Sequence, residues 1–199
     1  MNITRFILVG ENIHCTRSYK VDGPNVKKIG ENKYAILYRD INNQQKLLPV
    51  PEHFVNTSDW QSGKAKHCAI AIWMGLHGNH EEKSLGTDYI KALAYHQQQN
   101  GASYLDINVD EFSQNLNEQL NAISWTVETV QSVSTLPVCI DSSNCRILEV
   151  GLSLCKSDRG RPMLNSVSLE RTESIKIARK YNAVVIVSAA GEKGLPSGV

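Results

Sequence analysis

The stretch "LPVCIDSSN", residues 136–144, decides the fold. Its apolar residues are typical of a buried strand, and they are followed by Asp141, two serines and Asn144. Because parallel strands end at one edge of their sheet, polar groups at a strand end are typical of the ligand-binding edge of an α/β protein. A plainer interpretation exists for Asn144 alone, since asparagine is a preferred N-cap and the helical segment "CRILEV" follows it.

On both sides of this stretch, short apolar runs alternate with longer segments of helical period, which is the pattern of parallel βα units. The expected strands are "RFILVG" (5–10), "YLDINV" (104–109), "PVCID" (137–141), "MLNSVS" (163–168) and "AVVIVSA" (183–189). The expected helices cover 87–102, 116–133, 145–156 and 173–182. For the first helix we predict Thr87 as the N-cap and Gly101 as the left-handed residue at the C-terminus.

Residues 15–82 interrupt this alternation, because a βα loop usually has only about 2–6 residues. The segment contains "KYAILYRD", "KLLPV" and "AIAIWMG", which alternate like antiparallel strands. We therefore predict an insertion after the first strand with a small β element of its own.

Composition excludes several classes of protein. Twenty-one basic and 20 acidic residues give a formal charge of +1, without the basic excess of a nucleic-acid-binding surface. The five cysteines form no CxxC pair, and we interpret them as reduced thiols. Neither a signal peptide nor an apolar stretch of about 20 residues is present. We expect a soluble, cytoplasmic protein without nucleic-acid or membrane partners.

Polar side chains recur at the ends of the expected strands, where they would converge on one face of a (β/α)₈ barrel or an open α/β sheet. They are Glu11, Asp106, Asn108, Asp141, Asn165 and Ser188. Asp106 is unusual because it stands in the middle of a strand, where a charge is costly unless it is paired or used. It is either a functional group or part of a structural ion pair or hydrogen bond.

Three other segments have competing interpretations. "HGNHEE" (77–82) could bind a metal, but we favour a solvated loop and assign no metal site. His14 and Cys15 follow the first strand, and packing or solvent contact is favoured over catalysis by a Cys–His pair. "GEKGLPSG" (191–198) does not fit a phosphate-binding loop, and we interpret it as a mobile loop near the substrate.

The series "ILVGENI", "GASYLDINVD", "LPVCIDSSN", "MLNSVSLER" and "AVVIVSAAGEKGLP" resembles the pterin-binding barrel family. This family comprises dihydropteroate synthase, the folate domain of cobalamin-dependent methionine synthase and methyltetrahydrofolate:corrinoid methyltransferases. The resemblance is closest to the last group and covers residues 3–14 and roughly 85–198. The Asn-x-Thr-Pro-Asp-Ser-Phe element of the synthase branch does not follow the first strand.

The resemblance implies roles for the strand-end residues and for partners. Asp141 would anchor the pterin, Asn165 would reach N5 of the ring, and Asp106 would orient the pterin or its hydrogen-bond network with Asn108 as its partner. The reaction would be methyl transfer between methyltetrahydrofolate and cobalamin, or another corrinoid, carried on a partner protein or domain. The alternatives are a dihydropteroate synthase-like enzyme and a truncated, non-catalytic pterin-binding module.

The family barrel has eight strands, and five are expected here. The fold class is therefore α/β, a partial (β/α)₈ barrel, with residues 1–199 as the N-terminal part of one barrel domain. We expect the chain to be part of a longer enzyme. An uncovered sheet edge beside "AVVIVSA" would also allow pairing with another chain, including a homodimer.

Overall fold

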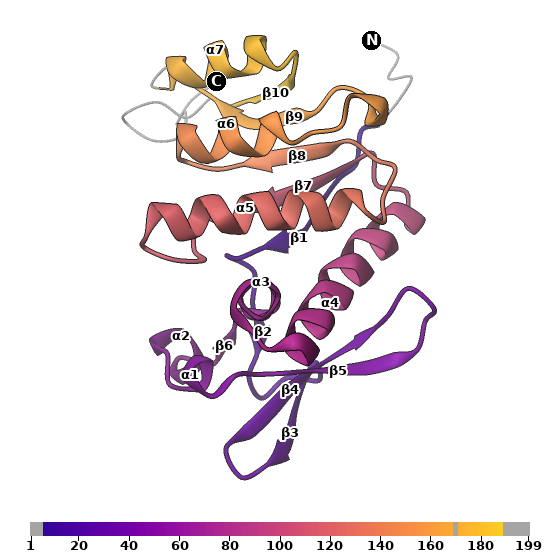
Figure 1. The fold of residues 1–199 in the computed structure, drawn as a ribbon, viewed down its shortest axis with the longest axis vertical. Helices are drawn as coiled ribbons and strands as arrows, with labels where there is room; N and C mark the ends of the chain where they lie inside the picture. The colour runs from indigo at the N-terminus through magenta and orange to yellow at the C-terminus, as the bar shows by residue number, and fades with distance from the viewer. Residues whose placement is uncertain (1–5, 169–170, 189–199) are drawn as a thin grey trace, which may run out of the picture.

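Five parallel strands form the central sheet of the computed structural model, which describes residues 6–168 and 171–188. Their order in the sheet is β1-β7-β8-β9-β10 (Figure 1). Strands that follow one another along the chain, among these five, are therefore also neighbours in the sheet. The bounds are β1 (Val9–His14), β7 (Tyr104–Asn108), β8 (Val138–Asp141), β9 (Met163–Val167) and β10 (Val184–Val187). The predicted order and parallel direction are confirmed.

Helices connect these strands and cover one face of the sheet. They are α4 (His80–Gln99), α5 (Leu116–Gln131), α6 (Cys145–Ser153) and α7 (Thr172–Lys180), with a short 3₁₀ turn η1 (Ser157–Arg159) before β9. Consecutive helices α5, α6 and α7 pack side by side (Figure 1). Asn144 caps α6 by accepting a hydrogen bond from the Arg146 backbone N–H at 2.9 Å, which confirms the capping interpretation.

The first strand lies further along the chain than expected. We predicted residues 5–10, whereas β1 extends from Val9 to His14 and contains the whole "GENIH" segment. Burial gives the reason, because Ile13 and the following Cys15 are fully buried, while the apolar residues 6–8 are mostly exposed. Pairing with β7 places His14 opposite Asn108 and brings the end of β1 into the sheet.

The insertion contains two small sheets and three helices. Strands β3 (Val26–Gly30), β4 (Lys33–Arg39) and β5 (Gln45–Pro49) form the predicted antiparallel sheet, and β2 (Tyr19–Lys20) pairs with β6 (Lys64–Ala65). The helices are α1 (Glu52–Val55), α2 (Ser58–Gln61) and α3 (His67–His77). The insertion is tied to α4 by Asp88, which accepts hydrogen bonds from Tyr38 Oη at 2.7 Å and Lys46 Nζ at 3.0 Å.

Three predictions within residues 66–100 are wrong. "AIAIWMG" is not a strand but part of α3, a helix buried on most sides against α4, so its apolar residues show no helical stripe. Helix α4 begins at His80 rather than Thr87, because Asn79 and Glu82 form a capping box. "HGNHEE" is therefore the junction of α3 and α4 rather than a loop, with His77 Nε2 3.0 Å from Glu118 Oε2. The left-handed Gly101 after α4 is confirmed by its φ of 87°.

Close packing of α3 and α4 generates a stability prediction. A Cβ at Gly86 would collide with the Ala71 carbonyl oxygen, which is backbone of α3 and cannot rotate away. We expect Gly86→Ala to lower the free energy of unfolding by about 1–3 kcal/mol in urea denaturation. The exposed Ser84→Ala on the same helix should change it by less than about 0.5 kcal/mol. A stabilised Gly86→Ala variant, as helix propensity alone predicts, would contradict this packing.

Candidate active site

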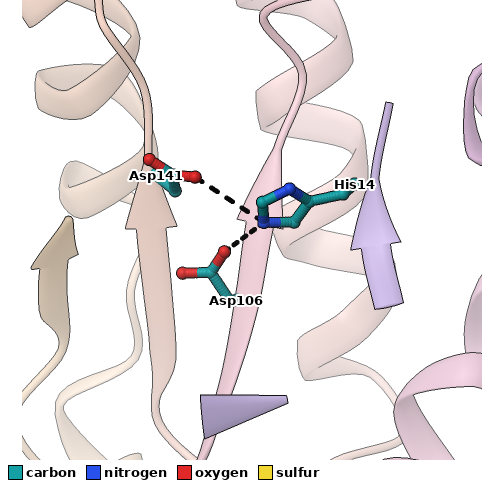
Figure 2. Close-up of side chains that lie close together, drawn as sticks. All are labelled: His14, Asp106 and Asp141. Carbon is teal, nitrogen blue, oxygen red and sulfur yellow. Dashed lines mark hydrogen bonds and ion pairs between the residues drawn. The ribbon is translucent and has the colours of Figure 1, made fainter. Parts of the chain in front are cut away.

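His14, Asp106 and Asp141 meet at the C-terminal ends of three neighbouring strands. His14 ends β1, Asp106 lies in the middle of β7, and Asp141 ends β8. Figure 2 shows one nitrogen of the His14 ring directed at both carboxylates: Nε2 is in direct contact with Asp106 Oδ2 and lies 3.6 Å from Asp141 Oδ2. His14 is 7% exposed and Asp106 is fully buried. The strand register, rather than a loop, sets the geometry of this cluster.

Asn108 orients Asp141. Its Nδ2 donates a hydrogen bond to Asp141 Oδ2 at 3.0 Å, while its Oδ1 accepts one from the Asp110 backbone N–H at 3.0 Å. Both ends of the amide are therefore engaged. The expected pairing of Asn108 with Asp106 is wrong, because residues 106 and 108 are consecutive on one face of β7 and Asn108 reaches across to the next strand instead.

The serines that follow Asp141 bind the loop after β7. Ser142 Oγ donates to Asp110 Oδ1 at 2.5 Å, and Ser143 donates to Asp110 Oδ2 from both its backbone N–H and its hydroxyl at 2.8 Å. Asp110 therefore joins the loops that follow β7 and β8. The "DSSN" segment thus combines a site carboxylate, two serines that hold neighbouring loops together and the N-cap of α6.

Burial and nearby negative charge oppose ionisation at this edge of the sheet. Desolvation raises the pKa of Asp141, and the charge of Asp106 adds to the rise, although the hydrogen bond from Asn108 lowers it. Burial and the charge of Asp106 also raise the pKa of the Cys139 thiol, which lies opposite Asp106 on β8. Asp106 Oδ1 is buried and accepts no hydrogen bond within the described residues. The site favours a ligand that brings positive charge or hydrogen-bond donors.

Asn165 lies beside the cluster, on the next strand. It is the register partner of Asp141, is partly buried, and its backbone oxygen accepts a hydrogen bond from the Ser142 N–H at 3.3 Å. The structure therefore brings together four predicted residues: Asp106, Asn108, Asp141 and Asn165.

Two other predicted residues have different contacts. Glu11 is exposed in β1 and forms an ion pair with Arg17. Ser188 follows β10, and its backbone N–H donates to the Val167 oxygen at 2.8 Å. The "GEKGLPSG" segment lies outside the described residues. None of these observations tests a role in ligand binding.

His14 is the residue that sequence reasoning missed. Packing correctly describes Cys15, which is fully buried, but His14 forms ion pairs with two carboxylates. Alternation along the strand could not have found it, because Glu11 and Asn12 are both exposed and Ile13 and His14 are both buried, with a register shift between Gly10 and Ile13.

The insertion forms a wall near the loop after β7. A cavity of about 280 Å³ lies between α2, α3 and residues 111–114. Lys66 Nζ crosses it to form ion pairs with Glu111 and, at 3.0 Å, with Asp59. Residues 15–82 are therefore linked to the site through the same β7 loop that contains Asp110.

A family model described as "Pterin binding enzyme" matches residues 80–195. The chain belongs to the pterin-binding enzyme family. The match includes β7 to β10, and so it contains Asp106, Asn108, Asp141 and Asn165. The five parallel strands are those of a partial TIM barrel, the fold of this family.

His14 precedes the matched residues, although β1 pairs with β7 in the same sheet. No helix in the described part of this family member is long and apolar enough to cross a membrane.

The raised pKa of Asp141 predicts a stability change at this site. The folded protein holds the Asp141 proton more tightly than the unfolded chain does, so stability falls as pH rises from about 4 through the folded-state pKa. Asp141→Asn removes this ionisation, and we expect it to raise stability at pH 7 and to have a smaller effect at pH 4.

Urea unfolding between pH 4 and pH 8 measures this, with Asp158→Asn in the exposed 3₁₀ turn as the matched control. A less stable Asp141→Asn protein at pH 7 would mean that contacts with His14 and Asn108 outweigh the cost of burying the carboxylate.

Proposed function

We propose that the protein binds the pterin ring at the ends of β7, β8 and β9 and catalyses methyl transfer between methyltetrahydrofolate, or a related pterin, and a corrinoid. The observation that carries this proposal is the pairing of Asp141 with Asn165. A carboxylate and an amide stand side by side on adjacent strands, about 4.8 Å apart. This spacing allows the two side chains to contact different atoms of one bicyclic ring.

Asp141 suits the pyrimidine edge of a pterin. This edge presents a 2-amino group beside a ring N–H, and one carboxylate can accept hydrogen bonds from both. The surroundings support such a ligand, because Asp141 is partly desolvated and the buried Asp106 carboxylate lies close to it. Asn108 keeps Asp141 oriented through its hydrogen bond at 3.0 Å. The carboxylate is thus positioned before the ligand arrives, which reduces the ordering cost of binding.

Asn165 suits the N5 side of the ring. A methyl group leaves N5 readily only when N5 is protonated or strongly hydrogen-bonded, and an amide can act as donor or acceptor as that charge changes. An interaction that strengthens as the methyl group leaves stabilises the transition state more than the bound substrate. We therefore assign Asn165 to the reacting side of the pterin and Asp141 to its anchoring side.

The methyl acceptor would be supplied by a partner. Cob(I)alamin carried on another protein or domain is itself a strong nucleophile, so residues of this chain need only hold the pterin and stabilise charge at N5. Asp106 and Asn108 would support the anchoring carboxylate rather than contact the methyl group. The motif series around β1, β7, β8 and β9 supports this activity over synthase chemistry.

Pterin anchoring is tested by Asp141→Asn. Replacing one acceptor of a charged bidentate pair with an amide donor should weaken methyltetrahydrofolate binding by about 2–4 kcal/mol in calorimetry. Asp158→Asn, distant from the site, should bind like the wild type. Because Asp141→Asn is expected to stabilise the fold at pH 7, weaker binding would not reflect unfolding. An unchanged dissociation constant would remove Asp141 from the pterin site.

Methyl transfer is tested by Asn165→Ala. We expect the rate of cob(I)alamin methylation to fall about 10²-fold, with a smaller loss of methyltetrahydrofolate affinity. Stopped-flow absorbance of cob(I)alamin measures the rate, and exposed Asn117→Ala at the start of α5 is the matched control. Absence of wild-type turnover would overturn the methyltransferase proposal. A defect confined to binding would overturn only the role of Asn165.

A further inference from the structure

We propose that His14, Asp106 and Asp141 form a binding site for a divalent transition-metal ion. One nitrogen and two oxygen ligand atoms from these side chains all lie within 4.8 Å of one another, and they come from three adjacent strands. Figure 2 shows the three side chains directed toward a common point. The inference goes beyond the proposed function, which needs no metal and assigns no ligand role to His14, although the two share Asp141.

Charge at the cluster favours a cation. Two carboxylates converge there, and among residues 6–168 and 171–188 His14 is the sole basic side chain that forms an ion pair with either. Asp106 is fully buried, and its Oδ1 has no hydrogen-bond partner in that part of the chain. A buried carboxylate with an unused oxygen is costly. A divalent cation would neutralise both carboxylates at once.

Outer contacts already orient two of the three ligands. His14 Nδ1 lies 3.4 Å from Thr16 Oγ1, which leaves Nε2 directed at the carboxylates. Asn108 Nδ2 donates to Asp141 Oδ2 at 3.0 Å. Hydrogen bonds of this kind to the second nitrogen of a histidine and to a ligating carboxylate are typical of metal centres, where they fix ligand orientation.

The ligand set selects the class of ion. One imidazole with two carboxylates suits zinc or manganese(II), whereas magnesium prefers oxygen ligands and water. In a tetrahedral zinc site the ligand atoms are roughly 3.3 Å apart, close to the 3.6 Å between His14 Nε2 and Asp141 Oδ2. The direct contact between His14 and Asp106 would have to open to admit the ion. Three protein ligands leave a position open for water or a substrate oxygen.

Calorimetry on chelator-treated protein tests the site with Zn²⁺ and Mn²⁺ as probes and Mg²⁺ as the comparison ion. We expect one Zn²⁺ or Mn²⁺ per chain and little binding of Mg²⁺. His14→Gln and Asp106→Asn should each weaken binding at least about 10-fold. His80→Gln, at an exposed histidine in "HGNHEE", should bind like the wild type.

Each contrary outcome is decisive. No wild-type binding, or equal binding by wild type and His14→Gln, would overturn the site. Loss of binding in His80→Gln would move the metal to residues 77–82. Circular dichroism establishes whether each variant is folded. If His14→Gln does not fold, metal binding by Asp106→Asn tests the site instead. Because the metal titration contains no pterin, it can succeed or fail independently of the methyltetrahydrofolate and cob(I)alamin measurements.

Discussion

The buried carboxylate of Asp106 is the constraint on which the rest of the site depends. A charge in the middle of a fully buried strand is tolerated only with a compensating partner, and the described residues supply His14 from the neighbouring strand. This contact requires β1 to extend to residue 14 and to pair with β7 in the observed register. The position of β1 therefore determines whether the buried Asp106 carboxylate of β7 has a partner.

From β7 the polar network continues across the sheet to β8 and β9. His14 also faces Asp141, Asn108 crosses from β7 to hold Asp141, and Asp141 is paired with Asn165 on β9. Asp110 binds the serines after β8, so the two loops at this edge are held as one unit. Such a network positions its polar groups before a ligand binds, which is what transition-state stabilisation requires.

The parts of the fold that could be predicted from sequence are those whose hydrophobic pattern fits only one type of secondary structure. Apolar stripes of helical period gave α5, α6 and α7, and parallel βα alternation gave the strand order. The strand predicted for "AIAIWMG" was wrong because a helix that is buried on most sides has no apolar stripe. The alternation of alanine and isoleucine in this segment therefore resembles the pattern of a strand. The prediction of Thr87 as the N-cap failed because Asn79, eight residues earlier in a polar segment, forms a capping box with Glu82.

The candidate site was predictable for residues whose role follows from their own strand. Asp106, Asn108, Asp141 and Asn165 lie within apolar runs, where polar side chains stand out in the sequence. His14 depends on a different fact, the length of β1, which the apolar residues 6–8 obscure because they suggest an earlier strand. Partners across strands likewise depended on register, so Asn108 was matched to Asp106 rather than to Asp141.

The site retains groups that oppose folding, and this indicates what the protein is built to bind. Burial raises the pKa of Asp141, and an unused oxygen of Asp106 remains in the interior. Hydrophobic residues of similar size would remove both costs, so the carboxylates contribute little to stability. His14 and Asn108 compensate these carboxylates in part, and a ligand with donors or positive charge would add to that compensation. The pyrimidine edge of a pterin would supply donors to Asp141, and a cation held by His14, Asp106 and Asp141 would supply positive charge to both carboxylates.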